Sequence, residues 1–290
     1  MDGRDEPGHD KREDTGHDER EGKGRNKMTQ TDKLVARKEG GVGIVTFNNP
    51  QRHNAVSLEM WDATKRALDA FAADDAVRVV VLTGAGDKAF VSGADISKFA
   101  DERASLEATR TYDARTAAAF SSVYDFPKPT IAMIRGYCIG GGLGVATCCD
   151  LRICSDNSVF AVPAAKLGLG YAYAGLKRLT DIVGHSYAKE IFYTARQFDA
   201  QEAYAMGLVN RVVPAAELES YVQSITDMIC ANAPLTIKAV KFTVGEILKD
   251  ESKRDIARAD AMVAQCFASS DYVEGRTAFM EKRKPVFTGK

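Results

Sequence analysis

The strongest constraint on the fold is a nearly continuous run of β-branched residues, VRVVVLT, from Val77 to Thr83. A strand with one solvent-facing side alternates apolar and polar residues, so this run predicts a strand that is buried on both faces. An amphipathic helix is predicted before it, from Leu58 to Ala73. Strand-like runs also occur at Val42–Phe47, Thr130–Ile134, Asp150–Ser155 and Val159–Val162. Strands that alternate with helices indicate an α/β fold with parallel pairing.

The chain divides by composition into three parts. Residues 1–31 are mostly charged, with mixed signs and almost no apolar side chains, so we expect a disordered tail. Met28 is a candidate for the true start, because folded-looking sequence begins only at Leu34. We expect an α/β core over residues 32–225, with helical sequence from about Ser97 to Tyr124, and a helical C-terminal region over residues 226–290.

Composition excludes several classes of protein. The chain has 39 Lys and Arg against 40 Asp and Glu, so it has no basic surplus for nucleic acid or an anionic membrane surface. No apolar run reaches the roughly 18 residues of a membrane span, and no secretory signal is visible at the N-terminus. The six cysteines form no C-x-x-C pair, so we expect neither a disulfide framework nor a metal site. These features together predict a cytoplasmic protein.

Two glycine-containing loops each precede a predicted helix: Ser92–Asp95 and Gly140–Gly142. The N-terminus of a helix presents unpaired backbone N–H groups, and glycine lets a ligand approach the backbone closely. If the loops face each other, their amides can bind one oxygen atom as an oxyanion hole. On spacing alone, tight helix–strand packing explains the glycines equally well. The triplet is neither a P-loop nor a G-x-G-x-x-G fingerprint, because Val145 replaces the last glycine of the latter.

The sequence after the tail resembles the crotonase superfamily, which includes enoyl-CoA hydratases and isomerases. The resemblance rests on five motifs in family order: NPQRHNAV (Asn49–Val56), AFVSGADI (Ala89–Ile96), GYCIGGGLGVATCCDLRI (Gly136–Ile153), AMGLVNRVVP (Ala205–Pro214) and EGRTAFMEKRKPVF (Glu274–Phe287). It implies a spiral of ββα units with a helical C-terminal trimerisation region. It also implies a homotrimer or a dimer of trimers.

The resemblance further implies a site for an acyl-CoA thioester. The amides of Ala94 and Gly141 would hold the thioester oxygen. Tyr171 falls where decarboxylases of the superfamily carry a tyrosine, and its phenol would donate to a carboxylate or an enolate. No separate cofactor is implied, since coenzyme A is part of the substrate. Its binding residues would be Arg52, Ala55, Gly93, Asp95, Ile96, Phe279 and Lys282.

The sequence departs from the family pattern where the resemblance places catalytic carboxylates. Gly144 stands at the position of the first hydratase glutamate, and Ala164 follows Pro163 at the position of the second. Ala172 occupies the position of an acid used by dienoyl-CoA isomerases. Syn addition of water needs a group that activates the water and a group that protonates the α-carbon. We therefore expect an acyl-CoA-processing enzyme that stabilises a thioester enolate but has weak ordinary hydratase activity.

Two alternatives stay open. A malonyl- or methylmalonyl-type CoA decarboxylase forms its enolate by losing CO₂, so it needs an oxyanion hole and no neighbouring carboxylate. A non-catalytic acyl-CoA-binding relative would keep the pocket and lack the chemistry. Retention of both glycine loops argues against the non-catalytic alternative, whereas the missing acids argue against an ordinary hydratase.

Overall fold

The computed structural model describes residues 31–98, 102 and 104–290. Residues 1–30, which make up nearly all of the predicted tail, lie outside the described residues. No helix in the described ranges is both long and apolar enough to cross a membrane.

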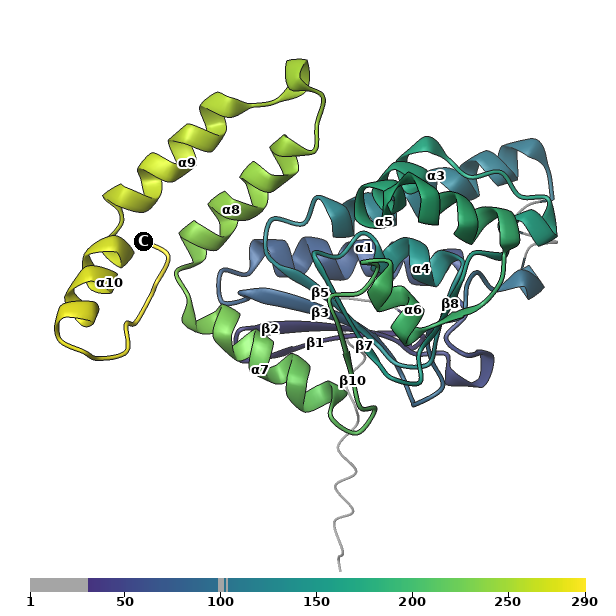
Figure 1. Cartoon of the computed structure of the whole chain (residues 1–290), viewed down its shortest axis with the longest axis horizontal. Helices are drawn as coiled ribbons and strands as arrows, with labels where there is room; N and C mark the ends of the chain where they lie inside the picture. The colour runs from purple at the N-terminus through teal and green to yellow at the C-terminus, as the bar shows by residue number, and fades with distance from the viewer. Residues whose placement is uncertain (1–30, 99–101, 103) are drawn as a thin grey trace, which may run out of the picture.

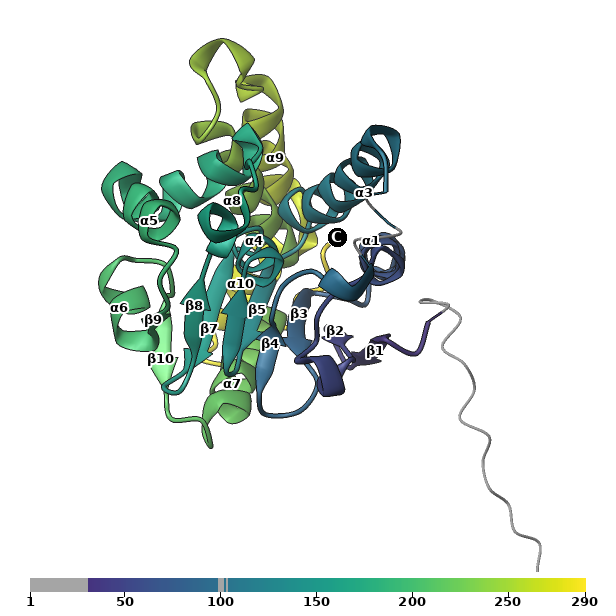
Figure 2. The same cartoon turned by 90° about the vertical axis from the view of Figure 1, so that its right-hand side faces the viewer.

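Two sheets form the centre of the molecule (Figures 1 and 2). The larger has the order β1-β2-β3-β5-β7-β10 and the smaller the order β4-β6-β8-β9. Pairing is parallel except between β1 and β2 and between β8 and β9. The strands are β1 (Leu34–Glu39), β2 (Val42–Phe47), β3 (Val79–Gly84), β4 (Ala89–Val91), β5 (Thr130–Ile134), β6 (Tyr137–Ile139), β7 (Leu151–Ser155), β8 (Val159–Ala161), β9 (Phe198–Asp199) and β10 (Arg211–Val213).

Helices follow the strands in a repeating order. Successive strand pairs β3–β4, β5–β6 and β7–β8 each place their first strand in the larger sheet and their second in the smaller one, and a helix follows each pair. The helices are α1 (Leu58–Ala73), α3 (Leu106–Tyr124), α4 (Gly141–Ala146), α5 (Tyr173–Thr194), α6 (Ala200–Ala205), α7 (Leu218–Ala231), α8 (Pro234–Ile247), α9 (Ile256–Ala268) and α10 (Ser270–Met280). This is the predicted spiral of ββα units, so the expected fold class is confirmed.

Strand β3 is buried on both faces, as its composition predicts. Val79 and Val81 pack in a cluster with Leu218 of α7, whereas Val80 and Leu82 belong to the main core on the α1 side. Figure 1 shows α7 beneath the larger sheet and α1 above it. Helix α1 has the predicted bounds, and its apolar stripe is buried at the predicted positions Leu58, Trp61, Leu68 and Phe71.

Two boundary predictions need correction. The sequence expected to be one helix from about Ser97 contains the 3-10 helix Ile96–Lys98, and α3 begins separately at Leu106, where Ser105 caps it by accepting a hydrogen bond from the amide of Ala108. The division at residues 225 and 226 falls inside α7, whose residues from Leu218 to Cys230 pack on the larger sheet. The helical extension therefore begins with α8, at Pro234.

Helices α8, α9 and α10 form an arm that projects from the α/β core (Figure 1). A few polar contacts join the arm to the core: Lys241 of α8 donates to the Lys128 carbonyl and pairs with Asp150, and Arg78 donates to the Phe287 carbonyl. Several apolar side chains of the arm are exposed, including Val240, Val244, Ile247, Phe267 and Phe279. A monomer therefore leaves much apolar surface of the arm uncovered.

Candidate functional site

The turn that carries NPQRHNAV is organised by the buried side chain of Asn54. Its Oδ1 accepts from the Asn49 amide at 2.9 Å, and its Nδ2 donates to the carbonyls of Ala85 and Ala89 at 3.0 and 2.7 Å. His53 and Asn54 both adopt positive φ, at 49° and 57°. Asparagine tolerates this left-handed conformation better than most residues because its side chain bonds locally. The turn is thereby fixed against the loop before β4.

The two glycine-containing loops meet beside this turn. Val56 pairs with Ala94 in an isolated parallel bridge, in which Val56 donates to Gly93 and Asp95 donates to Val56. A Cβ built on Gly141 would lie 3.9 Å from the Ala94 amide nitrogen, so the backbones of residues 94 and 141 lie close together. The predicted facing of the two loops is therefore present.

The amides of Ala94 and Gly141 have no hydrogen-bond acceptor among the described residues. The hydrogen bonds of the bridge at Ala94 involve the Gly93 carbonyl and the Asp95 amide, and not the N–H of Ala94 itself. Gly141 is the first residue of α4, where a helical N–H has no intrahelical partner. Two unpaired donors are thus available at one place.

Glycine is required at two positions of the second loop. Gly140 has φ 54° and ψ −113°, in the region that favours glycine. A Cβ on Gly142 would lie 2.1 Å from the Val91 carbonyl oxygen, which no side chain allows. The triplet therefore serves both tight packing of α4 on β4 and exposure of the Gly141 amide.

Arg52 does not project freely into solvent. Its guanidinium pairs with Asp95 at 3.0 Å and contacts the Ser97 hydroxyl, and its side chain remains 54% exposed. Burial would raise the pKa of Asp95, but hydrogen bonds from Ser97 and the charge of Arg52 outweigh burial and lower that pKa. The structure thus joins two predicted coenzyme-binding positions, Arg52 and Asp95. The next residue, Ile96, is exposed, and Ala55 lies beside the Asn54 turn, where its carbonyl accepts from Asn49.

An aromatic ring covers the position of the first missing carboxylate. A Cβ on Gly144 would lie 2.8 Å from Cε2 and 3.0 Å from Cζ of Phe120, which belongs to α3. Phe120 packs edge-to-face on Trp61 with ring centroids 5.1 Å apart, and Trp61 in turn lies 3.6 Å from a Cβ on Gly141. This aromatic wall was not anticipated, since nothing in the spacing of Phe120 indicates which helix its ring will meet.

The other two positions where the resemblance places a carboxylate, Ala164 and Ala172, differ in their exposure to solvent. Ala164 is buried within the 3-10 helix Pro163–Leu167, whereas Ala172 is exposed at the start of α5. Lys166 and Tyr173 are exposed as well, which fits solvated side chains.

Tyr171 packs on both parts of α5. Its ring meets Phe192 edge-to-face at 4.7 Å and lies 3.6 Å from a Cβ on Gly175. These contacts are possible because α5 is kinked at Gly184, with φ 74° and ψ 166°. Burial raises the pKa of the Tyr171 phenol above its ordinary value, so it remains a hydrogen-bond donor at neutral pH.

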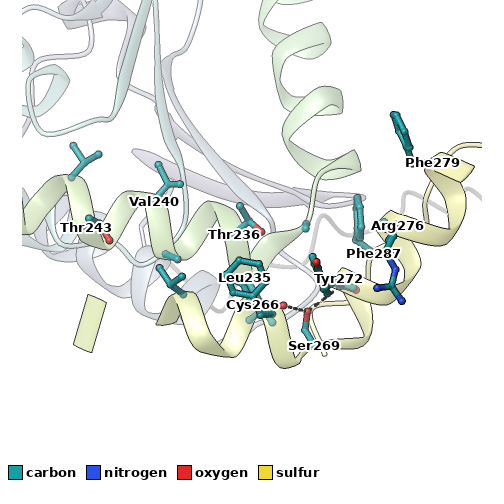
Figure 3. Close-up of a pocket in the computed structure, with 17 residues that line it drawn as sticks. Leu235, Thr236, Val240, Thr243, Cys266, Ser269, Tyr272, Arg276, Phe279 and Phe287 are labelled. Carbon is teal, nitrogen blue, oxygen red and sulfur yellow. Dashed lines mark hydrogen bonds between the residues drawn. The ribbon is translucent and has the colours of Figure 1, made fainter. Parts of the chain in front are cut away.

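Phe279 and Lys282 lie on the arm and not beside Gly141. Figure 1 shows α10 far from α4, so these residues do not meet Gly141 within one chain. Phe279 also lines an apolar groove of about 850 Å³ between α8, α9 and α10. Figure 3 shows Phe279 on the outer part of α10, apart from Tyr272 and Ser269.

Comparison with known proteins gives a consistent result. A sequence model of the enoyl-CoA hydratase/isomerase family matches residues 37–290. A crotonyl-CoA hydratase of Syntrophomonas wolfei is 36% identical over 260 residues, which cover 89% of this chain and 99% of that protein. A short-chain-enoyl-CoA hydratase of Clostridium acetobutylicum is 34% identical, with 88% and 97% covered.

A solved structure shares the fold. It is described as an enoyl-CoA hydratase/carnithine racemase from Magnetospirillum magneticum and superimposes with a TM-score of 0.85 at 37% identity, covering 91% of this chain and 98% of that one.

Proposed function

The chain belongs to the enoyl-CoA hydratase/isomerase family of acyl-CoA-processing enzymes, and we propose that it stabilises the enolate of an acyl-CoA thioester with the backbone amides of Ala94 and Gly141. The observation that supports this proposal is the pair of unpaired amides at one place, one from each glycine loop. Donors fixed before reaction stabilise the negative charge that develops on a thioester oxygen, because no reorganisation is needed.

Weak hydration is the second part of the proposal. Gly144 and Ala164 supply no carboxylate, and the Phe120 ring occupies the space over Gly144. A water molecule there would lack both a base and room. The two relatives described above are named as hydratases. We expect this chain to differ from them in that activity.

Decarboxylation of a malonyl- or methylmalonyl-type thioester is the alternative that these observations favour. Loss of CO₂ leaves the electron pair on the α-carbon as an enolate, and the same two amides would stabilise it. An aromatic wall without carboxylates does not repel the substrate carboxylate. Under this alternative, the Tyr171 phenol would donate a hydrogen bond to the substrate carboxylate or to the enolate.

Turnover of crotonyl-, dienoyl-, malonyl- and methylmalonyl-CoA by the wild type and two variants tests the proposal. Gly141→Pro removes one N–H at a helix position that accepts proline, and we expect a loss of about 10²–10³ in turnover of the best substrate. Gly141→Ala is the matched control, because its methyl group would have only ordinary contacts, at 3.6 Å from Trp61 and 3.9 Å from the Ala94 nitrogen. Unchanged turnover by folded Gly141→Pro would contradict the oxyanion hole. Binding of all four thioesters without turnover would favour the non-catalytic alternative.

We also propose that the protein works as a trimer or a pair of trimers. Exposed Val240, Val244 and Phe267 on the arm, and the groove between its helices, leave apolar surface that a partner would cover. Phe279 and Lys282 would then reach the coenzyme bound to another copy. Sedimentation at micromolar concentration is expected to give a trimer or hexamer, and a stable monomer would refute this assembly.

A further inference from the structure

Arg152 is a buried cation that the proposed chemistry does not yet use. It lies on β7 within the DLRI motif and is 6% exposed. Within the described residues it makes no ion pair with a carboxylate, whereas buried charges in proteins usually have such a partner. Burial lowers the pKa of its guanidinium, yet arginine stays protonated in proteins.

Backbone carbonyls at the C-terminal end of α4 surround this guanidinium. Nη1 donates to the Cys149 carbonyl at 2.6 Å and to the carbonyl of Ala146, the last residue of α4, at 3.5 Å. Nε donates to the Leu208 carbonyl at 2.7 Å, which accounts for part of the AMGLVNRVVP motif. The Arg152 backbone is held as well, by reciprocal hydrogen bonds with Asn210 at 2.8 Å.

The other end of α4 carries the Gly141 amide. Figure 2 shows this short helix between α5 and α6 on one side and α1 and α3 on the other, and four of its six residues are buried. A helix has a negative C-terminal end and a positive N-terminal end. A cation that neutralises the carbonyls at the negative end leaves the positive end without its compensating charge. The field at Gly141 therefore becomes more favourable for an anion.

We propose that Arg152 is a positioning residue that strengthens the oxyanion hole through α4. This inference rests on the proposed function, because it assumes that an oxygen binds at Gly141. Six helical residues span about 9 Å, and a hydrogen bond of about 3 Å at each end places the cation roughly 15 Å from that oxygen. With an effective dielectric constant of about 20, a unit charge at that distance changes an equilibrium or rate constant by roughly sixfold.

The test measures the infrared carbonyl stretch of an isotope-labelled butyryl-CoA thioester bound to the full-length protein. Polarisation by an oxyanion hole lowers this frequency, and butyryl-CoA carries the thioester without a reactive double bond or carboxylate. Arg152→Lys keeps the charge, whereas Arg152→Gln keeps an N–H donor and removes the charge. We expect Arg152→Lys to retain the frequency shift and Arg152→Gln to lose a measurable part of it, smaller than the part that Gly141→Pro loses. Turnover of the best substrate should fall roughly sixfold in Arg152→Gln with little change in KM.

Lys128→Met is the matched control. Lys128 also donates to carbonyls at the end of a helix, those of Phe71 in the last turn of α1 and of its C-cap Asp74, but α1 does not present Gly141. This control should leave the carbonyl frequency unchanged even where it lowers the melting temperature.

The outcomes separate this inference from the proposed function. No frequency shift in the wild type would contradict the oxyanion hole itself. A full shift in folded Arg152→Gln, alongside a shift in the wild type, would overturn the role of Arg152 alone. Should Arg152→Gln not fold, Arg152→Met is scored by the same criterion. Equal losses in Arg152→Lys and Arg152→Gln would show a structural role and would also overturn the proposal.

Discussion

A carboxylate introduced at residue 144 is expected to give no hydratase activity unless the Phe120 ring is truncated as well. In the Gly144→Glu variant the new Cβ would meet Phe120 at 2.8 and 3.0 Å, whereas ordinary contacts lie at 3.4–4 Å. Phe120 is held edge-to-face by Trp61, an interaction worth about 0.5–1.5 kcal/mol. Overpacking of a core typically costs about 1–3 kcal/mol. We therefore expect Gly144→Glu by itself to lose about 1–3 kcal/mol of stability and to gain no hydration.

Phe120→Ala makes room for the carboxylate. Phe120 is only partly buried, so its truncation should cost about 2 kcal/mol, below the range for a fully buried phenylalanine. In this background, Gly144→Glu with Ala164→Glu supplies both groups that hydration needs. Each positioned group typically contributes about 10²–10⁴ in rate. Burial of residue 164 would raise the pKa of its new carboxyl, so we expect a gain nearer 10-fold to 10²-fold over the background.

Hydration of crotonyl-CoA, followed by loss of the enoyl-thioester absorbance, measures the gain. Phe120→Ala alone is the control for an enlarged pocket and should remain inactive as a hydratase. Efficient hydration by the unmodified protein would refute the reasoning, because it would show that an acid from elsewhere in the fold replaces the missing carboxylates. If Gly144→Glu were as stable as the wild type, the predicted clash between residue 144 and Phe120 would be wrong.

Three further outcomes are expected. Asn54→Ala should lower the free energy of unfolding by about 2–3 kcal/mol in urea titrations, since it leaves one buried and two partly buried backbone groups unpaired and retains a positive φ. Asn54→Gly should recover about 1 kcal/mol of this loss; equal losses would show that φ does not matter. Tyr171→Phe should reduce turnover of malonyl-type thioesters and leave crotonyl-CoA binding unchanged, and equal effects on both would indicate a packing role. The wild type should be more stable than Asp95→Asn above the ordinary aspartate pKa of about 4, because the pKa of Asp95 is lowered in the folded state. This difference should decrease as the pH falls below about 4 and disappear once Asp95 is protonated in the folded protein. A difference that persists in acid would show that the Asp95 charge is unimportant.

The sequence by itself determined the α/β class, strand β3 as buried on both faces, and the bounds of α1. It also located the loops that hold Ala94 and Gly141. These features depend on patterns within a few residues: the period of apolar side chains, and glycine before a helix. Such patterns indicate which faces of a segment are buried, but they do not indicate which other segment packs against those faces.

Only the tertiary structure decided which distant residues share a site. Phe120 covers Gly144 because α3 packs beside α4, and Arg152 of β7 meets the carbonyl of Leu208, which lies 56 residues further along the chain. Phe279 and Lys282 lie on an arm remote from Gly141 in the same chain, although the sequence motif alone suggested one common site. Each of these contacts joins residues that are separated in sequence or belong to different elements. They arise when whole faces of helices and sheets are matched to bury apolar surface, and local periodicity carries no record of that matching.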